Sequence, residues 1–148
     1  MCYNGFSHTG ITSGGGIIMQ EIARQYGLKL IVLFGSYGTE HFKAGDSDID
    51  LALLSHTPLT EQQYLALLAA FSRYFGYSKI DLVDLRKASG LLKYQIATQG
   101  RLLYEEQEGD FLRYSLYCFR YYYDTAKFRR ERQAFLAQQL EELAHEQD

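Results

Sequence analysis

The sequence predicts a mixed α/β (α+β) fold, with helices flanking a small mixed sheet and a long helical segment at the C-terminus. Short apolar runs rich in β-branched residues alternate with stretches of helical periodicity, and this alternation is typical of a sheet covered by helices. The chain has 148 residues, of which 47% are hydrophobic and 22% charged. That length and composition suit one compact domain with a substantial core.

The first residues differ in composition from the rest. Residues 1–16 are rich in Gly, Ser and Thr and show no periodicity, so we expect a flexible N-terminal extension. Residues 17–148 then form the single domain. Met19 follows the extension closely, and we expect it to be the natural start of the protein.

Four strands and five helical segments are predicted in alternation. The strands are apolar runs bounded by glycine or polar residues: Lys29–Phe34, Asp48–Leu54, Lys79–Leu85 and Arg101–Tyr104. Helical spacing and stop or cap residues mark the helices: Ile18 to Gly27, Ser36 to Phe42, Thr60 to Gly76, Ser89 to Gly100, and Gly109 to Ala144 as one long helix or two broken ones. Thr60 with Gln63 has the spacing of a capping box, and Ser36 is placed to cap the second, short helix.

Charge and cysteine usage narrow the class of protein. The net charge is −3 and the pI about 5.8, which gives no support to broad electrostatic binding of nucleic acid. We find no apolar run of the roughly 18 residues that a membrane span needs, and the N-terminus lacks the basic start and apolar core of a secretory signal. Cys2 and Cys118 have no metal-ligand spacing. We therefore expect a reduced, cytoplasmic protein that binds neither nucleic acid nor membrane directly.

Two carboxylates open the second predicted strand, in the sequence Asp48-Ile-Asp50. Residues two apart in a strand point to the same face, so Asp48 and Asp50 project side by side. Two like charges so close raise each other's pKa unless a cation lies between them, and paired carboxylates are usual ligands of Mg²⁺ in phosphoryl-transfer sites. The alternative is a solvated acidic loop that leads into a strand.

Two further features bear on this site. Gly35-Ser36 follows the first strand, where glycine permits close backbone approach and backbone N–H groups with the Ser hydroxyl can bind an anion; the alternative is a simple capped turn. Asp81 and Asp84 lie on the third predicted strand and face opposite sides, because they are three residues apart. One of them could complete a three-acid cluster, and the residues alone leave the choice open.

Gly35-Ser36, a short segment and then Ser47-Asp-Ile-Asp-Leu51 resemble the signature of the DNA polymerase β-like nucleotidyltransferase superfamily. More narrowly, the chain resembles the minimal nucleotidyltransferases (MNT proteins) from Met19 onward, including KIDLVDL, GRLLYEE and the closing helix with YYYDTAKFRRER. The closing helix is similar to that of the MntA-type antitoxins, which pair with HEPN-domain toxins. The resemblance implies a polymerase β-like nucleotidyltransferase fold.

The resemblance also implies an activity. Gly35 and Ser36 would hold the phosphates of ATP, and Asp48 and Asp50 would bind two Mg²⁺ ions. Asp81, as the first acid of its strand, best matches the third carboxylate, which is metal ligand and base. Such proteins transfer AMP from ATP to a hydroxyl, and in the MntA branch the acceptor is a tyrosine of the HEPN ribonuclease, whose toxicity is thereby switched off.

The sequence departs from this pattern after Gly35-Ser36. Many family members continue with Arg-Ala-Arg-Gly, whereas this chain has Tyr37-Gly-Thr-Glu40, and the interval to Asp48 is one residue longer. A guanidinium that could meet the triphosphate is therefore missing, and Lys43 is the candidate substitute. Two other functions stay open: an antitoxin that neutralises by binding alone with a vestigial site, and a nucleotidyltransferase for a small molecule.

The C-terminal helix carries aromatic and basic residues together. Consecutive aromatics cannot all face one core, because a helix turns ~100° per residue, and exposed aromatics beside arginine are typical of protein interfaces. We expect this helix to bind the HEPN partner, although a solvated basic face is an equal alternative for its charges. The residues concerned are Phe119 to Tyr123, Lys127 to Arg130, and Arg132.

Overall fold

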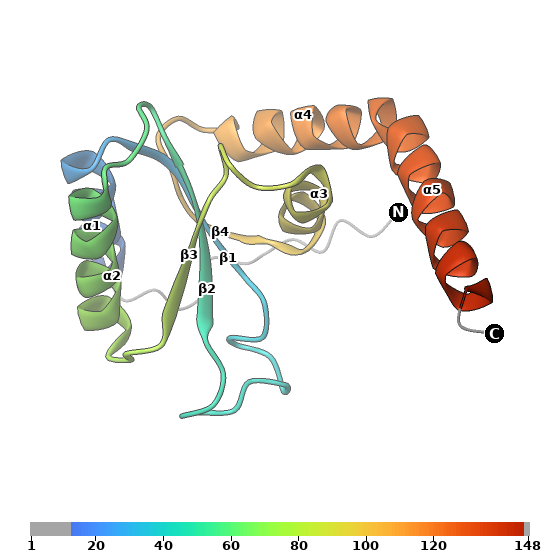
Figure 1. Ribbon diagram of the computed structural model, residues 1–148. Coiled ribbons are helices and arrows are strands. Elements are labelled where there is room, and N and C mark those ends of the chain that lie inside the picture. The colour runs from blue at the N-terminus through green and yellow to red at the C-terminus, as the bar shows by residue number, and fades with distance from the viewer. Residues whose placement is uncertain (1–12, 147–148) are drawn as a thin grey trace.

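The computed structural model describes residues 13–146 and contains a four-stranded sheet with five helices in that range (Figure 1). In chain order the elements are α1 (Ser13–Gln25), β1 (Leu28–Phe34), β2 (Ile49–Ser55), α2 (Glu61–Phe75), β3 (Ile80–Asp84), α3 (Gly90–Gln99), β4 (Arg101–Glu105), α4 (Asp110–Asp124) and α5 (Ala126–His145). The strand order is β3-β2-β1-β4. β1 is antiparallel to β2 and β4, whereas β3 is parallel to β2, so the predicted mixed sheet is confirmed.

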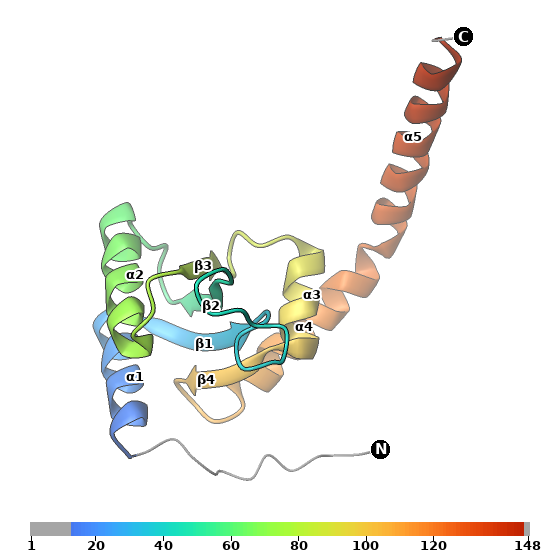
Figure 2. The same ribbon diagram turned by 90° about the horizontal axis from the view of Figure 1, so that it is seen from below.

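Helices cover both faces of the sheet. α1 and α2 lie on one side, α3 and α4 on the other, and α5 projects away from the domain (Figures 1 and 2). Burial on both faces explains why β1 is an almost continuous apolar run. The core beneath α1 and α2 includes Met19, Ile31, Leu51, Leu67 and Phe71. The core on the other face is smaller and consists of Leu30, Val32, Ala52, Leu85 and Ile96.

The N-terminal boundary differs from the expectation. α1 begins at Ser13, so residues 13–16 of the expected extension are helical, while residues 1–12 lie outside the described residues. Glycines have low helix propensity, but tertiary packing overrides propensity. Met19, Ile22 and Ala23 are buried against the sheet, and the glycines extend the helix that this packing secures.

The predicted short helix from Ser36 to Phe42 is wrong. The structure has consecutive turns there, in which the Thr39 amide donates to the Ser36 carbonyl at 3.0 Å and the Phe42 amide to the Thr39 carbonyl at 3.2 Å. The φ angles of Gly35 and Gly38 are 73° and 79°. These left-handed conformations suit glycine and do not occur in a right-handed helix, so Ser36 caps no helix.

The other predicted helix signals are confirmed. Thr60 and Gln63 form a reciprocal capping box, and Gly76 ends α2 in the left-handed conformation. Ser89 caps α3 by accepting from the Leu92 amide at 3.2 Å. The C-terminal segment is two helices, which break at Thr125. No helix in the described part of the chain is both long and apolar enough to cross a membrane.

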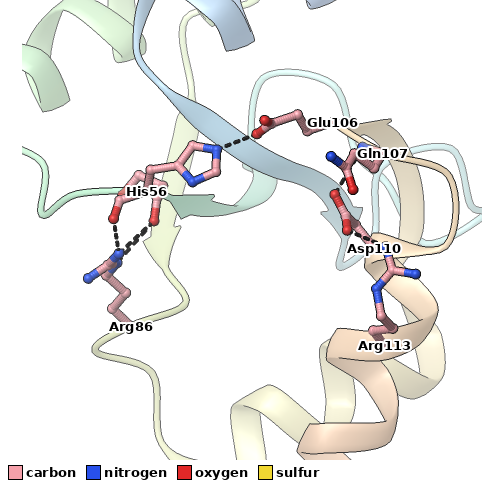
Figure 3. Close-up of polar contacts among 7 residues, drawn as sticks. His56, Arg86, Glu106, Gln107, Asp110 and Arg113 are labelled. Carbon is pink, nitrogen blue, oxygen red and sulfur yellow. Dashed lines mark hydrogen bonds and ion pairs between the residues drawn. The ribbon is translucent and has the colours of Figure 1, made fainter.

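A polar network secures one end of the sheet (Figure 3). The Arg86 guanidinium donates to the Ser55 carbonyl at 2.9 and 3.1 Å and also to the His56 carbonyl. His56 in turn pairs with Glu106, which follows β4. This network joins the segments that follow β2, β3 and β4, and it lies at the end of the sheet opposite the β1–β2 loop.

The start of α4 is fixed by two carboxylates. Buried Asp110 accepts from the Gln107 amide at 2.9 Å and pairs with Arg113, whose hydrogen bond holds the pKa of Asp110 below its usual value. Glu105 accepts from the Gly109 and Phe111 amides, each at 3.1 Å. Anionic acceptors at a helix N-terminus satisfy its unpaired N–H groups and complement its dipole.

We expect Glu105→Ala to lower the free energy of unfolding by about 1–2 kcal/mol, because two amides at the start of α4 lose their acceptor. Glu108→Ala is the matched control: Glu108 is exposed and contributes only its backbone carbonyl, to Arg113, so its effect should stay within about 0.5 kcal/mol. Urea denaturation of both variants checks this. Equal stability of the two variants would show that the Glu105 carboxylate does not cap α4.

Candidate active site

The strand register brings two of the predicted acids together. Asp50, the second residue of β2, lies opposite Asp81 of the parallel strand β3 and opposite Phe34 at the end of β1. Asp48 precedes β2 by one residue. Asp48 and Asp81 are exposed, whereas Asp50 is only partly accessible. The three acids therefore converge at the end of the sheet from which the β1–β2 loop extends (Figure 1).

The surroundings of Asp50 raise the pKa of its carboxyl group. Burial raises the pKa of its carboxyl above the ordinary value of 3.8, and the negative charges of Asp81 and then Asp48 raise it further. Both causes disfavour the ionised form. A cation bound beside these carboxylates would oppose the second cause and lower the pKa of Asp50.

Gly35 covers this carboxylate. A Cβ at position 35 would collide with the Asp50 carboxylate and would lie 3.0 Å from its Cγ, and the φ angle of 73° is itself unfavourable for other residues. Glycine is thus required twice, for conformation and for space. The backbone that begins the turn at Ser36 is held directly against the acidic group, as expected if nucleotide phosphates and a metal bind side by side.

Asp48, Asp50 and Asp81 carry oxygen donors of the kind that Mg²⁺ prefers, but their side chains do not form a complete coordination sphere. Within residues 13–146, no three His, Cys, Asp or Glu side chains are arranged to hold a metal ion. Mutual repulsion keeps carboxylates apart when no cation is present, and hard oxygen ligands are the donors that Mg²⁺ prefers. Asp84 lies further along β3, opposite Leu53, and accepts from the Arg86 amide at 2.9 Å, so the register places Asp81, rather than Asp84, beside Asp50.

The loop before Asp48 is anchored by a residue that the sequence analysis missed. The Tyr77 hydroxyl accepts from the Gly45 amide at 3.0 Å and donates to the Ser47 carbonyl at 2.5 Å. The Tyr77 ring also contacts Phe42, with 5.6 Å between ring centroids. Tyr77 therefore fixes the segment that leads into Asp48. No local signal marks this role, because residues 45 and 77 are far apart in the sequence.

Two cationic residues bear on the turn of residues 35–38: Lys43 follows it in the sequence, and Arg101 contacts it from β4. Lys43 is exposed, and its backbone amide donates to the Ser47 hydroxyl at 3.0 Å; the structure records no polar contact of its ammonium among the described residues. Arg101 begins β4 and donates a hydrogen bond to the Tyr37 carbonyl. Arg101 is the second residue that the sequence analysis missed, because it contacts a residue 64 positions away in the sequence.

The C-terminal aromatic and basic residues divide into two groups. Phe119 and Tyr122 pack on Tyr94 of α3, with ring centroids 5.7 and 4.2 Å apart. The Arg129 guanidinium lies 3.7 Å from the centre of the Tyr122 ring and donates to the Thr125 hydroxyl at 2.6 Å. These residues join α3, α4 and α5, so part of the aromatic set packs between helices.

The second group consists of exposed side chains on α5, where leucines accompany the aromatic residues. None of the residues of this helix is buried. Five large apolar side chains are between 50% and 68% exposed, namely Phe128, Phe135, Leu136, Leu140 and Leu143. Their spacing of three, four and seven residues places them on one side of the helix. We call this set the α5 stripe.

The fold and the acidic site define the class of protein. The Polymerase beta, Nucleotidyltransferase family model matches residues 18–109, and the chain belongs to this nucleotidyltransferase family. It is 42% identical, over 85 residues, to the Protein adenylyltransferase MntA of Shewanella oneidensis. That match covers 56% of this chain and 58% of the relative, so the alignment spans less than two thirds of the relative.

Two solved structures extend the similarity to more of the chain. One is a toxin–antitoxin crystal structure with AMP-PNP, at 31% identity and a TM-score of 0.64, covering 83% of this chain and 96% of the other. Another is a complex of tri-AMPylated Shewanella oneidensis HEPN toxin with MNT antitoxin, at 30% identity and a TM-score of 0.61, covering 86% and 98% of the two chains. The polymerase β-like fold predicted from the sequence is confirmed.

We expect Asp50→Asn to raise the melting temperature at pH 7 by about 2–4 °C in EDTA, since it removes a repelled, partly buried charge. The raised pKa means that the folded chain binds more protons than the unfolded chain. The charged form therefore lowers stability as pH rises above 3.8, and the gain should shrink as pH falls towards that value.

Asp46→Asn, an exposed change in the same loop, is the control for this measurement and should leave the melting temperature nearly unchanged. Differential scanning calorimetry between pH 4 and 7 records both variants. A gain that is the same at every pH would show that charge repulsion at Asp50 is not its source.

Proposed function

We propose that this protein is a Mg²⁺-dependent nucleotidyltransferase that transfers AMP from ATP to a tyrosine hydroxyl of a HEPN-domain ribonuclease, and so acts as its antitoxin. The observation that carries the proposal is the Asp50 carboxylate, which lies under Gly35 and opposite Asp81 with a raised pKa. Membership of the nucleotidyltransferase family and similarity to a protein adenylyltransferase support the same chemistry.

Each site residue has a role in this proposal. Gly35 and Ser36 hold the phosphates, with the ammonium of Lys43 near the triphosphate. Asp48, Asp50 and Asp81 hold two Mg²⁺ ions, which when bound supply charge neutralisation for the phosphates and activation of the acceptor hydroxyl. The protein otherwise contributes by positioning the reactants and by screening charge.

The transfer itself is a substitution at the α-phosphorus of ATP. The tyrosine oxygen forms a bond to this phosphorus, the bond to the bridging oxygen breaks, and pyrophosphate leaves. The phenolic proton passes to a carboxylate, for which Asp81 is the candidate because it is exposed at the edge of the sheet beside Asp50. The products are an AMP–tyrosine ester and pyrophosphate. The proposal places this reaction in the cytoplasm, where ATP is abundant.

The α5 stripe is the proposed binding surface for the HEPN toxin. Its apolar side chains are exposed and belong to neither core of the described part of the chain, where α5 contacts mainly α4. Exposed apolar patches of this kind mark interaction sites. Similar solved structures are toxin–antitoxin complexes that match most of this chain, which favours a HEPN protein as the occupant.

A binding-only antitoxin is the second candidate. The Lys43 ammonium makes no recorded polar contact within the described residues. The turn from Tyr37 to Glu40 contains an acid and no arginine, whereas this segment often contains arginine in family members. In this alternative the α5 stripe neutralises the toxin by occlusion, and the acids at the sheet end are vestigial.

We expect label from α-labelled ATP to appear on the HEPN partner when Mg²⁺ is present, and Asp48→Asn with Asp50→Asn to reduce transfer by at least about 10³-fold. Asp81→Asn should be similarly inactive, whereas Asp84→Asn, on the same strand, should keep activity within a few-fold. The candidate partner is the product of the neighbouring gene, if that gene encodes an Arg-x(4–6)-His ribonuclease motif. Gel autoradiography and intact mass measure the transfer.

Toxin neutralisation separates the two candidate functions. If the double Asp variant still copurifies with the toxin and still rescues cell growth, the binding-only function is correct. No transfer by the wild type at saturating ATP would contradict the enzymatic proposal. Transfer lost in Asp84→Asn but retained in Asp81→Asn would reverse the choice of third carboxylate.

We expect Leu136→Glu with Leu140→Glu to weaken the complex with the HEPN partner by at least about 100-fold in Kd, because two interface side chains become charged. Both positions are exposed, so the melting temperature of the free chain should change little. Ala134→Glu with Gln138→Glu adds the same charges at the same spacing to the opposite side of α5, at exposed positions, and is the matched control. Size-exclusion chromatography and calorimetric titration distinguish the two pairs, and equal affinities would exclude the α5 stripe as the interface.

A further inference from the structure

We propose that Arg101 is the positioning residue for the nucleotide-binding turn of residues 35–38, an inference that rests on the proposed function. Arg101 is the first residue of β4 and pairs with Leu33 of β1, two residues before Gly35. β4 is an edge strand of the sheet. The register therefore brings the half-buried Arg101 to the same end of the sheet as Asp50, although it lies 64 residues from Tyr37 in the sequence.

The contact between Arg101 and the turn is specific. Nη2 donates to the Tyr37 carbonyl. Nη1 lies only 2.5 Å from the position that a Cβ on Gly38 would occupy, and the φ angle of Gly38 is 79°. Glycine at 38 therefore leaves the space that the guanidinium fills. A side chain at this position would displace Arg101 and would also strain the backbone.

This contact determines the direction of a backbone donor. In a planar trans peptide the carbonyl of one residue and the N–H of the next point in opposite directions. Because Arg101 holds the Tyr37 carbonyl, the Gly38 N–H is turned away from the guanidinium. The structure records no acceptor for this N–H within the described residues, and a phosphate oxygen is the acceptor that a nucleotide would provide.

The charge of Arg101 has the sign that an anionic ligand requires. The segment from Tyr37 to Glu40 contains no cation of its own, and its only charged residue is the acidic Glu40. A guanidinium remains charged at all relevant pH values and combines charge with directed hydrogen bonds. Arg101 thus supplies from β4 a guanidinium beside the turn, where the sequence has none.

Binding of Mg²⁺·AMP-PNP to the full chain, measured by isothermal titration calorimetry, tests the role of Arg101. We expect Arg101→Met to weaken binding about tenfold, the effect of losing one charge-assisted hydrogen bond. Arg101→Lys keeps the charge and one donor and should recover part of the affinity. Arg73→Met, which changes an exposed arginine of α2, should bind like the wild type.

Hydrogen exchange without nucleotide gives an independent measurement. The Thr39 amide donates to the Ser36 carbonyl in the turn, and its protection should fall in Arg101→Met but persist in Arg73→Met. The proposal is overturned if the wild type binds the nucleotide and Arg101→Met binds it equally well, or if Arg101→Lys is as weak as Arg101→Met with Thr39 still protected. Failure of the wild type to bind Mg²⁺·AMP-PNP would instead overturn the proposed function, and this inference with it.

Discussion

The position of the Asp50 carboxylate constrains everything around it. It is partly buried, it lies opposite Asp81, and the backbone at Gly35 leaves no room for a side chain above it. Burial and like charge both oppose ionisation, so the site holds an ionised carboxylate most favourably when a cation is present. The glycine in the turn and the chemistry proposed for the site both depend on this one group, whereas the parallel pairing of β2 with β3 determines which acid lies beside it.

The two ends of the sheet differ in their polar groups: one end carries paired polar groups, and the other carries the three acids. At the end opposite Asp50, the polar groups are paired: Arg86 donates to two carbonyls, His56 pairs with Glu106, and Asp110 pairs with Arg113 (Figure 3). Proteins are only marginally stable, and unfavourable local arrangements persist where the surrounding structure compensates for them. The matched network keeps the strands in register, and that register sets Asp81 beside Asp50 despite their repulsion.

Features that depend on local periodicity could be predicted from the sequence, whereas features that depend on contacts between distant residues could not. Alternation along one predicted strand suggested that Asp48 and Asp50 lie close together, and strand pairing places Asp81, rather than Asp84, opposite Asp50. The helix expected after Ser36 does not form, because Gly38 has a left-handed conformation against Arg101, and no local pattern reports a contact across 64 residues. Tyr77 was missed for the same reason. The break at Thr125 has no Gly or Pro to mark it.

The exposed helix α5 supports the proposal that the acceptor is a protein. This 20-residue helix buries none of its side chains, and helices in water depend mainly on tertiary packing for their stability. Its direction is nevertheless fixed, because Arg129 packs on Tyr122 and donates to Thr125 at the joint with α4. These contacts hold an exposed apolar surface away from the domain, and a surface of this kind is suited to binding another molecule. If the substrate is a side chain of another protein, as proposed, such binding contributes to the positioning that transfer requires.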